Sequence, residues 1–274
     1  MATQTLNPYP LIGKQLTDGL DEISKALTPS STVDDLANAI FKYIQPLYYQ
    51  GSKSTQIEIE IRSVVYNIIN SYNNQKICGN MFNYQQMILV DMMLGETTTD
   101  YTPINALGAW LSDIEDNISE TKLPIDEQTP LLLGIEVGKS VYNYWVNTVQ
   151  NPGKWQQFFQ EDPSLNYMNI PFWLAACMEG GLIGASGSER GLIAPTTDIV
   201  SVEIVSSLIG ALAIGAGKVI FKWVPRIQPA ELLGGFSAAV GFGDDAMLVG
   251  SNKQHCPYTN NCQGGNCVAG CGKK

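Results

Sequence analysis

The stretch that decides the fold reads IVSSLIGALAIGAG, from Ile204 to Gly217, and it contains no charged residue. Small residues recur at every fourth position, so that Ser207, Ala211 and Gly215 share one helical face. Such a face lets two helix backbones approach closely, in a membrane or in a tightly packed soluble core. We therefore predict a helix here that pairs with another helix through its small residues.

Two interpretations of this helix differ in its surroundings. It is either a membrane-inserting or helix-pairing segment, or the central helix of a soluble bundle, buried on all sides. The uncharged stretch is 14 residues long and lies between Glu203 and Lys218. A membrane span needs roughly 20 apolar residues, whereas roughly 10 to 14 are typical of a buried core helix. The length favours the core helix, and a membrane is the less favoured partner.

Amphipathic helices are predicted along most of the chain before this stretch, because apolar residues recur at three- and four-residue intervals. The first ends at Thr28-Pro29, and the second begins at Thr32 with Asp35, as in a capping box, and runs to Pro46. Residues 57–62 alternate as in a strand, but the apolar pattern continues at helical spacing to residue 72. Further helices are predicted over 81–94, 104–118, 130–149 and 172–184, with Thr129-Pro130 opening the third of these and Asp198 capping the last apolar helix.

We find no series of strand patterns, so we predict a mainly α fold, a multi-helix bundle with a small irregular tail. The helical domain covers residues 1–224, of which about 180–224 are rich in Gly and Ala and apolar. A flexible, glycine-rich connector follows over residues 225–254, and a cysteine-rich tail over 255–274. Within the connector, Gly234-Gly235 resembles a double-glycine cleavage site. Pro229 interrupts the apolar pattern before it, which favours a plain linker.

The tail carries the strongest local chemical signal. Its four cysteines are interleaved with Pro, Asn and Gly, and too few apolar residues are present to form a core, so the tail is either cross-linked or disordered. Two disulfides would suffice, and so would a thiolate-bound metal such as zinc, with the histidine as a further ligand. The alternatives are a modified peptide cut from a longer precursor and a reduced, flexible end. The candidate disulfide or metal residues are His255, Cys256, Cys262, Cys267 and Cys271.

The charge is distributed unevenly along the chain. The net charge is −10, but the last 24 residues contain three lysines and no acid, which leaves −13 on the rest. An acidic body argues against nucleic acid as a partner, because phosphate contacts need clustered Lys and Arg. It also argues against strong attraction to anionic lipid.

No catalytic residue is predicted. His255 is the single histidine and lies in the tail, so catalysis by Ser-His-Asp or Cys-His is not expected. The run from Gly134 to Ser140 lacks the glycine at position 133 that a phosphate-binding loop requires, and we reject it as a nucleotide site. Cys78 and Cys177 lie in apolar surroundings and are predicted to be buried, inert thiols.

A dense group of aromatic residues lies between positions 142 and 173. It indicates either a ligand groove or packing between helices, and packing is the more frequent explanation. The group consists of Tyr142, Tyr144, Trp145, Trp155, Phe158, Phe159, Tyr167, Phe172 and Trp173.

The opening residues from Asn7 to Gly13 read NPYPLIG and precede the amphipathic first helix. They resemble a group of uncharacterised bacterial helical proteins that open with Asn-Pro-Tyr, two variable residues, an aliphatic residue and Gly. Many members of that group also carry a Gly/Ala-rich apolar segment near the C-terminus. The resemblance implies a helical fold and a bacterial source, and it implies no activity.

These observations lead to a first functional hypothesis and its alternative. The first is a non-enzymatic bacterial interaction or assembly protein that contacts a protein partner, itself or another, through its stapled tail. The alternative is an exported membrane-active effector or bacteriocin-like precursor, in which residues 199–221 insert and the tail is the active or released part. A carboxylate enzyme with an aromatic-lined pocket is less favoured. We see no signal peptide, so we expect synthesis in the cytoplasm, with signal-less export left open.

Overall fold

The computed structural model describes residues 9–52, 54–73, 81–95, 104–159, 163–187 and 201–222, and these contain eight α-helices and no strand. The prediction of a mainly α fold is therefore confirmed. The connector and the tail lie outside the described residues. The elements are α1 (Pro10–Ala26), α2 (Val33–Tyr48), α3 (Ser54–Asn73), α4 (Tyr84–Gly95), α5 (Ile104–Glu120), α6 (Ile125–Gln150), the short 3-10 helix η2 (Gly153–Gln157), α7 (Pro163–Ser186) and α8 (Val202–Ile220).

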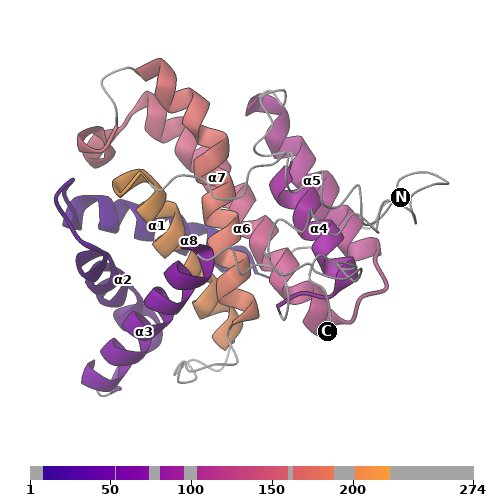
Figure 1. Ribbon diagram of the computed structural model, residues 1–274, viewed down its shortest axis with the longest axis horizontal. Helices are drawn as coiled ribbons and strands as arrows, with labels where there is room; N and C mark the ends of the chain where they lie inside the picture. Colours follow the sequence, from indigo (N-terminus) through magenta and orange to yellow (C-terminus); the bar gives the residue numbers. More distant parts are fainter. Residues whose placement is uncertain are drawn as a thin grey trace, which may run out of the picture.

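Helix α8 runs through the centre of the molecule (Figure 1). It contacts α1, α2, α3, α6 and α7, and every residue from Val205 to Ile220 is buried. Helices α1 to α3 lie on one side of α8, whereas α4 and α5 lie on the far side of α6. A helix that is apolar on all faces needs cover on all faces, and five neighbouring helices provide it here.

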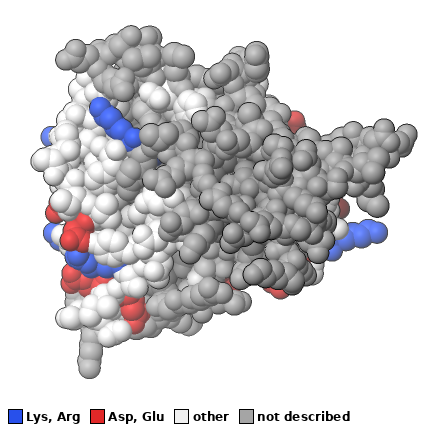
Figure 2. Space-filling model, viewed as in Figure 1, with Lys and Arg blue, Asp and Glu red and all other residues white. Residues whose placement is uncertain are grey.

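The outer helices present one apolar face to this centre and a polar face to solvent. Helix α2 begins with the predicted capping box: the backbone N–H of Asp35 donates to the Thr32 hydroxyl over 3.2 Å, and the backbone N–H of Thr32 donates to the Asp35 carboxylate over 2.8 Å. Its apolar residues Leu36, Ile40 and Ile44 are fully buried. Charged side chains of both signs lie on the α2 and α3 side of the face shown in Figure 2. Between these two helices and within α3, Asp34 and Glu58 each lie 3.5 Å from the Arg62 guanidinium.

One predicted helix start is wrong. Helix α6 begins at Ile125, immediately after Pro124, and Pro130 lies inside it. The backbone N–H groups of Glu127 and Gln128 both donate to the Pro124 carbonyl over 3.0 Å, so helical hydrogen bonding is established before Thr129. Acidic residues at positions 126 and 127 favour this earlier start, because they face the positive end of the helix dipole.

Two further predicted helix limits differ in the structure. Helix α2 continues past Pro46 to Tyr48. Pro46 removes only its own backbone N–H from the helix, the backbone N–H of Tyr49 still donates to the Gln45 carbonyl over 2.9 Å, and Tyr48 is buried in the core. The N-cap of α8 is Ser201, whose hydroxyl accepts the backbone N–H of Ile204 over 3.4 Å. Asp198, the predicted cap, lies outside the described residues.

Candidate functional site

The two innermost helices, α7 and α8, pack against each other through their backbones, and we call them the central pair. A Cβ atom added to Gly180 would overlap the carbonyl oxygen of Gly210, and a Cβ added to Gly210 would overlap the carbonyl oxygen of Gly180. A Cβ on Gly184 would likewise overlap the carbonyl oxygen of Ser206. Rising numbers on α7 meet falling numbers on α8, so the helices are antiparallel. Only glycine permits this distance of approach.

The predicted small-residue face of α8 lies partly in this contact. A Cβ on Gly181 would lie 3.3 Å from the Ser207 hydroxyl oxygen, and a Cβ on Gly215 would lie 3.5 Å from the Cβ of Cys177. Ala211 is fully buried. The chain therefore supplies its own partner for residues of this face, in the form of α7.

The closest points of the central pair were missing from the predicted face. They are Gly180 and Gly184 on α7, and Gly210 with the carbonyl of Ser206 on α8. Each helix shows a four-residue spacing of small residues, the same signal that marks Ser207, Ala211 and Gly215. The same signal, applied to both helices, would have found them.

Polar side chains are buried inside the central pair. Glu179 on α7 and Lys218 on α8 are 6% and 9% exposed. Burial raises the pKa of Glu179 to about 8 and lowers the pKa of Lys218 to about 8, and the attraction between the two groups partly offsets both shifts. The hydroxyls of Ser206 and Ser207 are buried without a hydrogen-bond partner. An unpartnered buried hydroxyl costs about 1 to 3 kcal/mol of folding stability, so these two serines oppose part of the stability gained where the backbones pack closely. Cys177 is a free, fully buried thiol.

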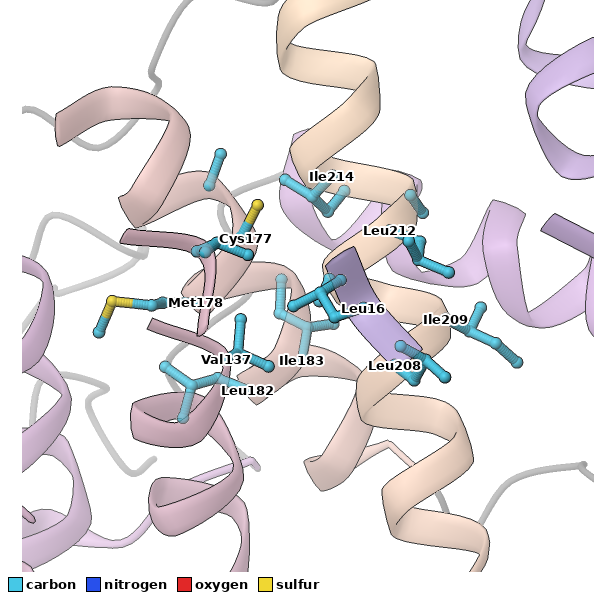
Figure 3. Close-up of a cluster of buried hydrophobic side chains, with 14 of the residues drawn as sticks. Leu16, Val137, Cys177, Met178, Leu182, Ile183, Leu208, Ile209, Leu212 and Ile214 are labelled. Atoms are coloured by element: carbon cyan, nitrogen blue, oxygen red, sulfur yellow. The ribbon is translucent and has the colours of Figure 1, made fainter. Parts of the chain in front are cut away.

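The contacts between the central pair and its neighbours are of a different kind. Besides α7, four helices contact α8, namely α1, α2, α3 and α6. We call these four helices the sheath. Leu212 of α8 fits against Gly19 of α1, where an added Cβ would lie 2.9 Å from a leucine methyl. Apolar side chains from α1, α6, α7 and α8 meet around this boundary in Figure 3, which labels Leu16, Val137, Met178, Leu182 and Leu208 among others.

The run from Gly134 to Ser140, rejected as a phosphate-binding loop, lies within helix α6. Its two glycines receive side chains of α7: a Cβ on Gly134 would lie 2.9 Å from Leu182, and a Cβ on Gly138 would lie 2.8 Å from the sulfur of Met178. The glycines of this run therefore serve the packing of α6 on the central pair.

The aromatic group packs on itself at one end of α6 and α7. Trp145 meets Trp155 and Trp173 with ring centroids 5.4 and 5.1 Å apart, and Phe159 stacks on Trp173 at 5.3 Å. The indole N–H of Trp155 donates to the Tyr144 hydroxyl over 2.6 Å. These contacts join α6, η2 and α7, so helix packing accounts for most of the aromatic group, whereas Tyr167 is exposed.

One buried acid lies outside the central pair. Asp91 of α4 is 6% exposed, and its Oδ1 atom has no hydrogen-bond partner. Burial raises the pKa of the Asp91 carboxyl to about 7. A single acid within the apolar run of residues 87–94 was the signal in the sequence, and it was overlooked.

Metal binding and cleavage were predicted only for residues beyond Lys222. His255 and the cysteines 256, 262, 267 and 271, with the zinc proposed for them, lie outside the described residues, as do Gly234, Gly235 and Cys78. Within the part of the chain that the structure describes, no group of three or more His, Cys, Asp or Glu side chains could hold a metal ion.

Searches of protein-family models, of curated proteins and of solved structures find no match to this chain. Among the described helices, α8 alone is long and apolar enough to cross a membrane by length and composition, a property that buried core helices share. The central pair is therefore the feature of the described residues on which a function can be argued.

Proposed function

We propose that this chain is a non-enzymatic, membrane-active effector that inserts its central pair into a lipid bilayer. The observation that carries the proposal is the organisation of α7 and α8: a helix of spanning length, joined backbone to backbone to a second apolar helix and covered by amphipathic helices. The sheath shields the apolar helix pair from water and so keeps the protein in solution until a bilayer replaces the sheath.

The dimensions of α8 support this proposal. It has 19 residues, and a rise of about 1.5 Å per residue gives a length of roughly 30 Å, close to the hydrocarbon thickness of a bilayer. Lys218 lies in the last turn of α8, where a long ammonium side chain reaches the headgroup region. Synthesis in the cytoplasm followed by export belongs to the same proposal.

The test is release of a trapped dye from phosphatidylcholine vesicles by the full-length protein. Neutral lipid is the appropriate probe, because an acidic body is repelled by anionic headgroups. We expect dye release, and peptides from α7 and α8 that vesicles protect from protease. Absence of both release and protection over the whole protein concentration range would overturn the proposal.

A second candidate function is the interaction or assembly of proteins through the cysteine-rich tail. The observation that favours it is the contrast between a body of charge −13 and a tail with lysines and four cysteines but no acid. Intact mass with and without reductant and chelator would identify a disulfide or a bound metal. Deletion of residues 255–274 is expected to reduce self-association in sedimentation, and an unchanged monomer with and without the tail would contradict this candidate.

A further inference from the structure

We infer that α7 and α8 enter the bilayer as one unit, so that the molecule divides between the central pair and the sheath and not between α7 and α8. This inference rests on the proposed function and specifies which contacts are broken and which persist. It follows from a difference between the two boundaries: one is formed by backbones and polar groups, and the other by apolar side chains.

Contacts within the central pair depend on atoms that lipid tails cannot replace. The carbonyl oxygens of Gly180, Gly210 and Ser206 lie directly against the opposite backbone. Contact between backbones at small residues is also the usual way in which helices associate inside membranes, where no hydrophobic effect acts between them. The glycines that bring α7 and α8 together in the described fold would therefore serve equally well in lipid.

Polar groups point to the same division. Glu179 of α7 and Lys218 of α8 are both buried and interact electrostatically, so a pair that moves together preserves this interaction. Ser207 faces Gly181 of the partner helix. If α8 left alone, the buried Glu179 would lose the attraction of Lys218 and would remain in the protein, and a buried acid without a partner is costly.

Contacts between the central pair and the sheath are ones that a bilayer can substitute. Leu212 meets Gly19 of α1, and Met178 and Leu182 meet the glycines of α6. Hydrocarbon tails are as apolar as leucine, so transfer of these side chains from protein to lipid has little net effect on their free energy. The boundary that opens is therefore the apolar one.

Two engineered disulfides test where the molecule divides. Gly215→Cys faces the native Cys177 and would join α7 to α8, with 3.5 Å between the two Cβ atoms. Gly181→Cys with Val137→Cys would join α7 to α6 of the sheath, with 3.6 Å between the Cβ atoms. Both separations lie within the range that a disulfide requires, about 3.5 to 4.5 Å. Peptide mass spectrometry establishes that each bond has formed.

Dye release from phosphatidylcholine vesicles is then compared before and after reduction, with the wild-type protein treated identically to account for its other cysteines. We expect the α7–α8 disulfide to leave release within about twofold of its reduced form. We expect the α6–α7 disulfide to lower release at least tenfold and reduction to restore it. Helical circular dichroism of each oxidised protein serves as the folding control.

The outcomes separate the two proposals. If the wild type releases dye but the α7–α8 disulfide abolishes release, the inference fails and the proposed function stands. If the α6–α7 disulfide has no effect, the inference fails as well, because the sheath then does not open. If the wild type releases nothing, both fail. Should the double variant not fold, protease accessibility of α6 in vesicle-bound wild type replaces it: accessible α6 beside protected α7 and α8 supports the inference, and protected α6 overturns it.

Discussion

Helices α2 and α8 have similar lengths, 16 and 19 residues, and satisfy opposite demands. Helix α2 buries one stripe, is closed at its start by the Thr32 capping box and turns its acids to solvent. Helix α8 is buried on every side from Val205 to Ile220 and meets its main partner through the backbone at Gly210. The position and ends of α2 are therefore determined by side chains within its own sequence, whereas the packing of α8 is determined by the space that the other helices leave for it.

This comparison predicts that the two helices respond differently to the smallest substitutions. A methyl group on the buried face of α8 should matter more than the loss of a complete cap on α2. The tests below run from the largest expected effect to the smallest.

Gly210→Ala should destabilise the protein by about 4 kcal/mol, because the added Cβ overlaps the Gly180 carbonyl and no side-chain rotation relieves the clash. Helix propensity alone would make this substitution stabilising by about 1 kcal/mol, so a measured loss of stability would identify the backbone clash. Gly108→Ala in α5 is the matched control: its nearest atom is a Tyr142 ring carbon at 3.3 Å. We expect it to be neutral or slightly stabilising in urea unfolding. Equal stabilities of the two variants would contradict backbone packing of α7 on α8.

Asp91→Asn tests a buried polar group on a helix that lies outside the central pair. The folded-state pKa of about 7 lies above the ordinary value of 3.8, so the unfolded state loses the proton first and the wild type loses stability as pH rises through this interval. The variant does not titrate. We expect it to match the wild type near pH 4 and to exceed it by about 3 to 4 kcal/mol at pH 8, because each pKa unit corresponds to about 1.4 kcal/mol.

The measurement is the melting temperature from pH 4 to 8, with Asp113→Asn on the exposed face of α5 as the control. The control should stay within about 0.5 kcal/mol of the wild type. A difference between Asp91→Asn and the wild type that does not grow with pH would show that the Asp91 carboxyl ionises without penalty in the folded protein.

Thr32→Ala should destabilise the protein by about 1 kcal/mol, because it removes the hydroxyl that accepts the backbone N–H of Asp35. Ser63→Ala on the exposed side of α3 should change stability by less than about 0.5 kcal/mol. Denaturant unfolding measures both. A loss larger than that of Gly210→Ala would reverse the order that the comparison of α2 and α8 predicts.

Most helices were predictable from the chain itself. The apolar spacing of α1, α2, α3 and α5 depends on a stripe that each helix carries within its own residues, and the capping box of α2 is a local motif. The alternating start of α3 was resolved by the longer helical pattern that follows it. Such signals can be recognised without knowing which helices pack against them, because the residues that form the stripe and the cap are close together in the chain.

Helix ends were less predictable where two signals compete. Pro124 and Pro130 each suit the start of a helix, and contacts with residues at the start of α4 add to the local effect of the acids at positions 126 and 127. The side chain of Asn83 donates to the Glu127 carboxylate over 2.6 Å, and Gln86 donates to the Glu127 carbonyl over 2.8 Å. These contacts hold the additional turn of α6 and join residues more than 40 positions apart.

The stretch from Ile204 to Gly217 separates what the sequence determines from what the tertiary structure determines. Its composition determined that it forms an uncharged helix with a face of small residues, because both properties belong to the chain alone. Tertiary structure decided that α7 is the partner, that Gly210 is one of the points of closest approach and that five helices cover α8. A small residue permits close approach without specifying what approaches, and only the packed molecule supplies the second backbone.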